Sequence, residues 1–327
     1  MENFKIKLTN FLELTRAYSL LMSLAPWFLV LLWAQIYLPS LLNAALTLIG
    51  IICVHLGTNL LDDYIDVTRE LNNGKTLENI DFGTINNKAR LILNKTFSLN
   101  DVTRIIALLY AVAMVIGIYF TIVAGAWIPI IIAITAVLCI LYPYATKYYC
   151  GELIVGVIFG PLLMSGTYYA LSGLLSTRIL IMSISVGLLT AALLHTHAIM
   201  DWEYDCKVGK NTFCRLFKTK PNAIYALQVI VWLAYINVIF FVIAGFLHPN
   251  TLYVLLTLPI AVELFKSIKD YINIKDVKFL PKWWMGPMED WENIKNNHMD
   301  FFMYRFYLAR NIAFLFCIFA GIACYLR

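Results

Sequence analysis

Charged residues are scarce in this chain: they make up 14% of its 327 residues, whereas 61% of the residues are hydrophobic. Soluble domains carry roughly 25% charged and about 45–50% apolar residues, so the composition excludes an ordinary soluble protein. Cysteine motifs are also missing. No two of the seven cysteines form a CxxC pair, and their spacing matches no zinc-binding pattern. The sequence is instead rich in long apolar runs.

These runs are long enough to cross a membrane, since a spanning helix needs about 20 mostly apolar residues. They fall near 17–37, 40–61, 104–125, 127–145, 152–174, 178–199, 223–246, 250–266 and 308–326. Three longer polar stretches separate them, at 62–103, 200–222 and 267–307. The sequence therefore predicts an all-α, multi-pass membrane protein with about nine transmembrane helices in one bundle, and a single domain over residues 1–327.

The cations are divided unevenly between the two sides that nine spans create. With the N-terminus in the cytoplasm, all 25 lysines and arginines except Arg178 and Arg327 fall on the cytoplasmic side. The cytoplasmic loops of membrane proteins are enriched in Lys and Arg. We therefore predict that the three long polar stretches and the active site are cytoplasmic. The net charge of +5 reflects this bias and contact with anionic membrane lipid. It calls for no nucleic-acid partner, and we expect a bacterial or archaeal cell membrane.

Acidic side chains gather at the inner end of the second predicted span. Residues 59–70 read Asn-Leu-Leu-Asp-Asp-Tyr-Ile-Asp-Val-Thr-Arg-Glu. Side chains three or four positions apart lie on one face of a helix. The spacing therefore predicts one polar stripe, which Glu70 can extend and which consists of Asn59, Asp62, Asp63 and Asp66.

A second acidic cluster, at the inner end of the sixth predicted span, lies on the same side of the membrane. There His197, Asp201 and Asp205 follow one another at helical spacing. Carboxylates one turn apart repel each other, and Mg²⁺ binds through a few carboxylates, waters and substrate phosphate oxygens. Two facing stripes thus predict a Mg²⁺ site for a diphosphate leaving group; the alternative is that the acids only cap helices or pair with nearby cations. The predicted metal ligands are Asn59, Asp62, Asp63, Asp66, Asp201 and Asp205, and the predicted catalytic residues are Asp63, Asp66, Asp201 and Asp205.

Both motifs resemble those of the UbiA superfamily of intramembrane prenyltransferases. The first family motif runs N-D-x-x-D-x-x-x-D; here Asp62 stands at the Asn position, Asp63 and Asp66 match, and Glu70 replaces the last Asp. The second is D-x-x-x-D followed by G-K-x-T, and the matching residues are Asp201, Asp205, Gly209, Lys210 and Thr212. The resemblance covers the whole chain and implies a nine-helix bundle.

Residues 141–169 look like the dihydroxynaphthoate polyprenyltransferases of menaquinone synthesis. This resemblance implies that Tyr142 and Lys147 approach the diphosphate. Lys147 is also the only basic residue at the inner end of the fourth predicted span, where it either binds phosphate or anchors the helix at the interface. The predicted diphosphate-binding residues are Lys147, Lys207, Lys210 and Arg69.

The acceptor pocket is predicted from scattered residues. Arg16 stands where many family members carry Arg-Pro at the start of the first span, so it either faces the acceptor or the phosphate or anchors the helix at the interface. His197, one turn before Asp201, is suited to accept a phenolic proton, to orient the carboxylate, to bind a metal, or only to bond a neighbouring helix. Aromatic walls either stabilise an allylic cation by their ring faces or simply pack. The predicted acceptor-pocket residues are His197, Arg16, Tyr142 and Tyr168.

The predicted function is Mg²⁺-dependent transfer of a polyprenyl group from polyprenyl diphosphate to an aromatic quinone precursor, and the resemblance implies 1,4-dihydroxy-2-naphthoate. One alternative is another aromatic or lipid acceptor within the superfamily, and another is an isoprenoid-binding protein without activity. A cation-coupled transporter would also carry intramembrane carboxylates, but near the middle of the membrane. The Trp-rich stretch 279–292 is expected either to cover the site or to dock at the interface.

Overall fold

The computed structural model describes residues 2–37, 39–80, 89–207, 209–273 and 279–325. Within these ranges the chain forms helices and no strands, and nine helices are long and apolar enough to cross a membrane. Each of the nine overlaps one of the predicted spans, so the prediction of a nine-span bundle is confirmed. The protein is an integral membrane protein.

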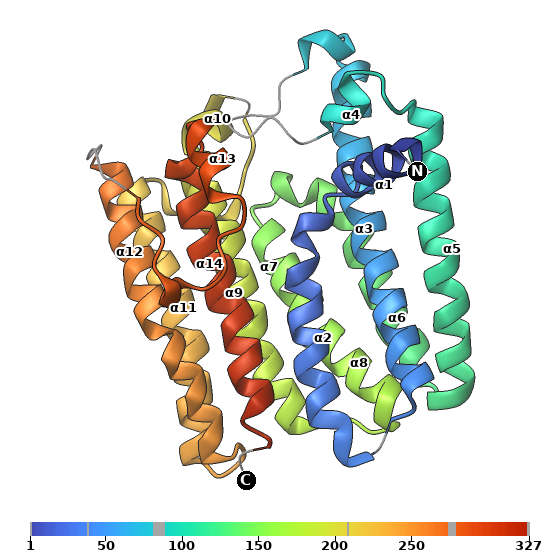
Figure 1. Cartoon of the computed structure of the whole chain (residues 1–327), viewed down its shortest axis with the longest axis vertical. Coiled ribbons are helices and arrows are strands. Elements are labelled where there is room, and N and C mark those ends of the chain that lie inside the picture. Colours follow the sequence, from blue (N-terminus) through green and yellow to red (C-terminus); the bar gives the residue numbers. More distant parts are fainter. Residues whose placement is uncertain (1, 38, 81–88, 208, 274–278, 326–327) are drawn as a thin grey trace.

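Five of these spans are single α-helices: α3 (Leu41–Asn72), α5 (Leu99–Ala124), α9 (Thr177–Met200), α11 (Lys220–Ile243) and α14 (Asp300–Ile322). The other four combine shorter pieces: Ala17–Leu20 with α2 (Leu21–Ala34), α6 (Trp127–Leu141) with a turn at Tyr142–Lys147, α7 (Gly151–Val157) with a π-helical turn at Ile158–Leu162 and α8 (Leu163–Ser172), and Pro249–Thr257 with α12 (Leu258–Ile272). Four short helices lie outside the spans: α1 (Glu2–Leu14), α4 (Arg90–Leu93), α10 (Trp202–Lys207) and α13 (Trp291–Asn296). Figure 1 shows these four at the same end of the bundle.

Several spans begin where a hydroxyl side chain caps the helix. The side chains of Ser40, Ser98, Ser176 and Thr219 each accept a hydrogen bond from the backbone N–H three residues later. Such caps satisfy one of the N–H groups that the first turn leaves unpaired, and each contributes about 1 kcal/mol. Local sequence therefore sets the start of these helices.

Helix α3 is longer than its predicted span. It continues to Asn72, past the predicted end at residue 61, because the acidic stretch is itself helical. The first acidic stripe consequently lies on the last turns of a spanning helix, and the first polar loop begins after it.

The bundle has a densely packed side and a sparsely packed side. In Figure 1, α9, α11, α12 and α14 form one group, and α3, α5 and α6 lie at the opposite side. The most apolar window is 78% buried in α9 and 67% buried in α14, against 11% in α5 and 22% in α6. The main hydrophobic core thus lies around α9 and α14, and α5 and α6 face the lipid as a thin wall.

Glycine permits the closest helix contact in the packed side. A Cβ atom added at Gly160 would lie 2.3 Å from the backbone oxygen of Ser183, and one added at Gly187 would lie 2.4 Å from that of Gly156. Real Cβ atoms do not approach backbone oxygens this closely. Small residues of this kind let helix backbones meet in membranes, so these glycines set the distance between the α7–α8 span and α9.

The Trp-rich stretch forms a strap, residues 279–290, that runs back along α14. The Asn311 amide donates to the carbonyl oxygens of Met285 (2.9 Å) and Pro287 (2.8 Å), and Arg310 donates to Pro287 (2.6 Å) and to the Glu289 carboxylate (2.8 Å). Asn311 stands about 16 Å along α14 from Asp300, at about 1.5 Å per residue. Irregular backbone at that depth requires protein partners for its polar groups, and these two side chains supply them.

The predicted third loop, 267–307, therefore needs revision. Helix α12 continues to Ile272, α14 begins at Asp300, and the strap between them returns toward the middle of the bundle. Among the described residues, none of the strap lines the large cavity described below. The strap therefore docks against α14 and does not cover this cavity, and it lies deeper than the interfacial position expected for it.

Candidate active site

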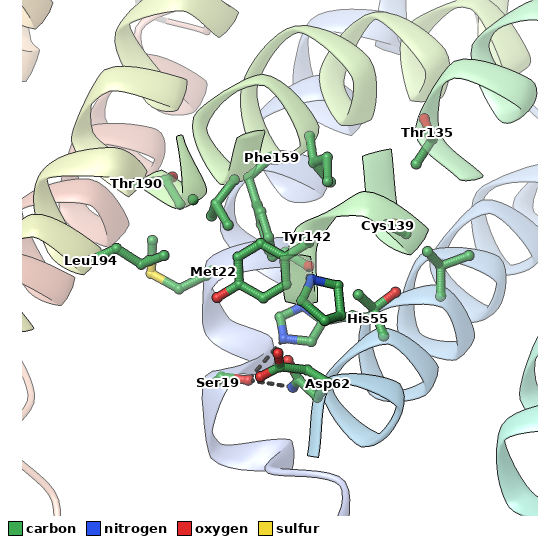
Figure 2. Close-up of a pocket in the computed structure, with 18 of the residues that line it drawn as sticks. Ser19, Met22, His55, Asp62, Thr135, Cys139, Tyr142, Phe159, Thr190 and Leu194 are labelled. Carbon is green, nitrogen blue, oxygen red and sulfur yellow. Dashed lines mark hydrogen bonds between the residues drawn. The ribbon is translucent and has the colours of Figure 1, made fainter. Parts of the chain in front are cut away.

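A cavity of about 1650 Å³ opens within the bundle. At one end it is lined by acidic and basic side chains from α3, α9 and α10, and it continues along apolar residues of α3, α5, α6 and α8. Figure 2 shows Asp62 on one wall, Thr190 and Leu194 of α9 on another, and Thr135 and Cys139 of α6 opposite them. The two acidic motifs thus share one cavity.

All but one of the residues predicted for the first stripe line this cavity. Asn59, Asp62 and Asp66 line it, and so does Glu70. Asp63 is not among the lining residues and its side chain is 1% exposed. Asp62 and Asp66 are one turn apart on α3, whereas Asp63 is rotated by about 100° from Asp62 on a helix of 3.6 residues per turn.

The second stripe lines the cavity with all three members, His197, Asp201 and Asp205. Helix α9 ends at Met200, but the backbone bonds from Asp201 N to His197 O (3.0 Å) and from Asp205 N to Asp201 O (2.9 Å) preserve the helical spacing. His197 Nδ1 lies 3.3 Å from Asp201 Oδ2. Burial raises the pKa of Asp205 to about 6, and Lys210 opposes the shift.

The donor set fits a magnesium ion held jointly with a substrate. In the part of the chain that the structure describes, no three His, Cys, Asp or Glu side chains are close enough to hold a metal ion by themselves. Asp201 Oδ1, however, is buried without a hydrogen-bond partner there. Mg²⁺ usually takes one or two carboxylates and completes its shell with waters and phosphate oxygens, which agrees with separated carboxylates around one cavity.

Basic side chains stand beside both stripes. Lys207 and Lys210 line the cavity, as does Arg69, whose Nη1 lies 3.1 Å from Asp66 Oδ1. The Arg69 guanidinium also donates to the carbonyl oxygen of Pro143 (3.2 Å). The side chain of Lys147 lies outside the described part of the structure, so its predicted phosphate contact stays a prediction.

Arg16 crosses from the N-terminal segment to α3. Its Nη2 lies 3.2 Å from Asp62 Oδ2 and 3.2 Å from Asp63 Oδ1, and it donates to the carbonyl oxygen of Asn59 (2.9 Å). Burial opposes its charge, but Asp63 and Asp62 outweigh burial and raise the pKa of Arg16. Arg16 lines the cavity at its acidic end.

The other predicted acceptor-pocket residues are separated by the fold. His197 and Tyr142 line the cavity, but Tyr168 is not among its lining residues. Its buried ring packs edge-on against Tyr37 at 6.1 Å, in the core at the other end of the bundle. A direct contact between Tyr168 and an acceptor in this cavity therefore does not agree with its position.

Sequence reasoning did not assign a role to His55, although this residue lines the cavity. Its ring nitrogens lie 2.8 Å from Ser19 Oγ and 2.6 Å from Ser23 Oγ, and Phe159 packs against it edge-on at 5.2 Å. Figure 2 shows the ring between Asp62 and Phe159. Its position in the sequence, one turn before Asn59 on the polar face of α3, could have indicated that it lines the site.

An aromatic lobe adjoins the second stripe. Phe302, Phe306 and Met303 of α14 line the cavity, and the ring of His197 meets Phe302 edge-on at 5.0 Å. Planar aromatic molecules pack favourably on such rings. The cavity therefore combines a charged end, an aromatic lobe and a long apolar channel.

This architecture matches known proteins. The sequence model of the UbiA prenyltransferase family matches residues 23–285. The chain belongs to this family. As a UbiA-family member it is a membrane prenyltransferase, an enzyme that transfers prenyl groups.

Two curated relatives illustrate the range of the family. A 1,4-dihydroxy-2-naphthoate octaprenyltransferase of Bacillus subtilis is 26% identical over 260 residues, 78% of this chain and 80% of the relative. A digeranylgeranylglyceryl phosphate synthase of Methanobrevibacter smithii is 26% identical over 226 residues, 68% of this chain and 74% of the relative. The UbiA-family chain described here is thus similar to one enzyme named for an aromatic acceptor and to another named for a glycerol-lipid product.

Solved structures share the fold at low sequence identity. A UbiA homologue from Archaeoglobus fulgidus, bound to GPP and Mg²⁺, superposes with a TM-score of 0.60 at 14% identity, covering 96% of this chain and 99% of that one. A structure of a digeranylgeranylglyceryl phosphate synthase also gives a TM-score of 0.60, at 20% identity, and covers 98% of this chain and 99% of that one. At this identity the likeness establishes the fold.

Proposed function

We propose that the enzyme transfers a polyprenyl group from polyprenyl diphosphate to an aromatic quinone precursor, with Mg²⁺ as cofactor. The observation that carries this proposal is the single cavity that joins two acidic stripes to a long apolar channel. The acidic stripes suit a diphosphate bound with Mg²⁺, and the apolar channel suits a polyprenyl tail. The Archaeoglobus fulgidus homologue, which shares the fold, is bound to GPP and Mg²⁺, and this supports a prenyl diphosphate and Mg²⁺ as ligands.

In this proposal Asp62 and Asp66 on α3, with Asp201 and Asp205 from the second stripe, hold Mg²⁺ together with the diphosphate. Bound there, Mg²⁺ neutralises the charge that develops on the leaving group. Arg69, Lys207 and Lys210 bind the outer phosphate oxygens, because charge-assisted hydrogen bonds to phosphate are strong. These three cations line the same end of the cavity as the carboxylates.

The reaction begins when the bond between the allylic C1 and the diphosphate oxygen breaks and its electron pair leaves with the diphosphate. An electron-rich carbon of the acceptor then attacks C1 and forms the new carbon–carbon bond. The ring regains aromaticity by losing a proton or, for 1,4-dihydroxy-2-naphthoate, its carboxyl group as CO₂. Apolar walls that exclude water protect the cation until the acceptor attacks.

The channel suits a long donor. Its lining on α3 extends from Asp62 to Thr47, about 22 Å along the axis at about 1.5 Å per residue. It continues past Phe120 of α5 and Ala170 of α8. A tail of several isoprene units lies along such a path, whereas a single unit would leave most of it unfilled.

The aromatic lobe favours an aromatic acceptor. Phe306 and Met303 line the cavity beside the buried Phe302, which packs against His197. We propose that this lobe binds 1,4-dihydroxy-2-naphthoate, the acceptor in the name of the relative from Bacillus subtilis. The second candidate is a glycerol-lipid acceptor, which the relative from Methanobrevibacter smithii brings forward. A polar, non-aromatic headgroup would gain little from these rings.

We further propose that the charged end of the cavity faces the cytoplasm, that the N-terminus lies on that side of a bacterial or archaeal cell membrane, and that residues 1–327 form one domain. The excess of basic residues at this end supports the orientation.

The test is mass spectrometry of products formed by the purified enzyme in lipid nanodiscs. Farnesyl and longer diphosphates would be offered with Mg²⁺ and with a panel containing 1,4-dihydroxy-2-naphthoate, 4-hydroxybenzoate and geranylgeranylglyceryl phosphate. We expect a prenylated, decarboxylated naphthoquinol and loss of product in Asp201→Asn. Glu78→Gln, an exposed carboxylate away from the cavity, is the matched control. Product from the glycerol lipid alone would replace the aromatic acceptor by the second candidate.

A further inference from the structure

We infer that Asp63 is a positioning residue for the diphosphate rather than a ligand of the metal: it holds Arg16 across the acidic end of the cavity, where Arg16 binds the diphosphate of the prenyl donor. This inference rests on the proposed function and deepens it. It assigns distinct roles to two adjacent aspartates that look equivalent in the sequence.

The carboxylate of Asp63 is engaged on the side of α3 that faces away from the cavity. Its Oδ1 lies 3.2 Å from Arg16 Nη2, and its Oδ2 accepts the backbone N–H of Ala89 at 3.3 Å. The side chain is 1% exposed and does not line the cavity. A metal ligand would have to present an oxygen to the space that the substrate enters, and Asp63 presents its oxygens to protein.

Arg16, by contrast, does line the cavity. Its ion pairs and its bond to the Asn59 carbonyl all use one nitrogen, Nη2. A guanidinium carries five N–H donors, and Arg16 Nε is buried without a hydrogen-bond partner in the described structure. Spare donors on a fixed guanidinium suit the oxygens of a diphosphate.

The position of Arg16 is determined by three segments that meet at Asp63. Arg16 adopts a left-handed backbone conformation (φ 54°, ψ 43°) between α1 and the first span. Ala89, at the start of α4, is bound to Asp63, and Arg90 of α4 donates to the Glu13 carboxylate of α1 at 2.9 Å. The Asp63 carboxylate thus ties α3 to α4 and to the end of α1, and so fixes the guanidinium that α1 delivers.

Charge balance supports the division of roles. Asp62 and Asp63 place two negative charges on adjacent residues, and Arg16 lies within ion-pair distance of both. When a cation and a diphosphate enter, Asp62 can turn to the cation while Asp63 still neutralises Arg16. Without Asp63, Arg16 would lose one of its two ion pairs, and the diphosphate would lose a fixed partner.

Asp63→Asn tests the inference, with Asp66→Asn, Arg16→Gln and the double variant Arg16→Gln/Asp63→Asn beside it and Glu78→Gln as control. Calorimetry would measure the binding of inorganic diphosphate at saturating Mg²⁺, and kinetics would give KM for the prenyl donor and the Mg²⁺ concentration for half-maximal rate. Thermal unfolding of each variant would verify that it is folded.

We expect Asp63→Asn and Arg16→Gln each to weaken diphosphate binding and to raise the donor KM by about tenfold, with the half-saturating Mg²⁺ concentration unchanged. The double variant should be no worse than either single variant, since both remove the same contact. Asp66→Asn should instead raise the Mg²⁺ requirement. Glu78→Gln should match the wild type.

A higher Mg²⁺ requirement in Asp63→Asn would make Asp63 a metal ligand and overturn the inference, as would unchanged diphosphate binding or additive losses in the double variant. If Asp63→Asn alone failed to fold, Asp63 would be a structural residue and the inference would be overturned. Wild-type diphosphate binding by a folded Arg16→Gln variant would overturn it as well. A wild type that binds no diphosphate with Mg²⁺ would contradict the proposed function itself.

Discussion

The two sides of the bundle differ in how tightly their helices pack. Around α9 and α14 the helices bury most of their surface against one another, while α5 and α6 bury little and form one wall of the cavity. The packed side positions the second acidic stripe and the aromatic lobe, whereas the thin side leaves room for an apolar chain. Close packing and room for a substrate are thus provided by different groups of helices.

The largest effect is expected where the packed side is tightest. Gly160→Ala places a methyl group 2.3 Å from the Ser183 backbone oxygen, which neither helix can avoid without moving. We expect a loss of about 3 kcal/mol, the upper end for overpacking, seen as a lower melting temperature. Gly50→Ala on the cavity side is the matched control, because its methyl would meet the Ile116 side chain at 3.4 Å. Equal losses would erase the distinction between the two sides.

The cavity side should gain stability from its ligands. Mg²⁺ with inorganic diphosphate at 100 times its dissociation constant should stabilise the folded protein by about 2.7 kcal/mol, seen as a higher melting temperature. Chelation of the metal should reverse the shift, and Asp201→Asn should remove it. A shift that survives in Asp201→Asn would place the binding elsewhere.

The strap should depend on its two buried partners. Asn311→Leu leaves the carbonyl oxygens of Met285 and Pro287 without these bonds, at a cost of about 2 kcal/mol in stability. Tyr119→Phe is the control on the thin side, since it removes one bond to Asn43 that is partly exposed. If both variants melt alike, the strap contributes no more than a peripheral contact.

The smallest effect concerns the channel alone. Thr135 of α6 lines the cavity, and its hydroxyl donates only within its own helix, to Ile131 O at 2.8 Å. Thr135→Trp should fill the channel and lower kcat/KM for long donors about tenfold, equivalent to about 1.4 kcal/mol, with farnesyl diphosphate less affected and the melting temperature unchanged. Competition between donors of two lengths measures this directly. Equal loss for both lengths would contradict a tail in this channel.

Hydropathy predicted the nine spans because burial of apolar surface in lipid is a property of local composition. It did not predict that α3 continues to Asn72, since the acidic turns are helical but polar. Helical spacing predicted that Asp62, Asp66, Asp201 and Asp205 face one site, and all four line the cavity. It could not separate Asp63 from them, because a stripe defined by three- and four-residue steps is wide enough to include a residue that points aside.

The positions of Tyr168 and of the strap also could not be predicted from local sequence. An aromatic residue on a spanning helix looks the same at either end, and only the packing of Tyr168 against Tyr37 shows that it faces away from the cavity. The Trp-rich stretch reads as a loop until Arg310 and Asn311 are seen to bind its carbonyl oxygens. His55 was overlooked although it shares a face with Asn59.

Composition and helical periodicity were enough to predict the class of the protein, the number of its spans and a set of candidate residues for binding a metal and a diphosphate. Tertiary structure decided which of those residues share a cavity and which support it from behind. The direction in which a helix presents each side chain depends on the neighbours that the helix packs against, and those neighbours come from distant parts of the chain.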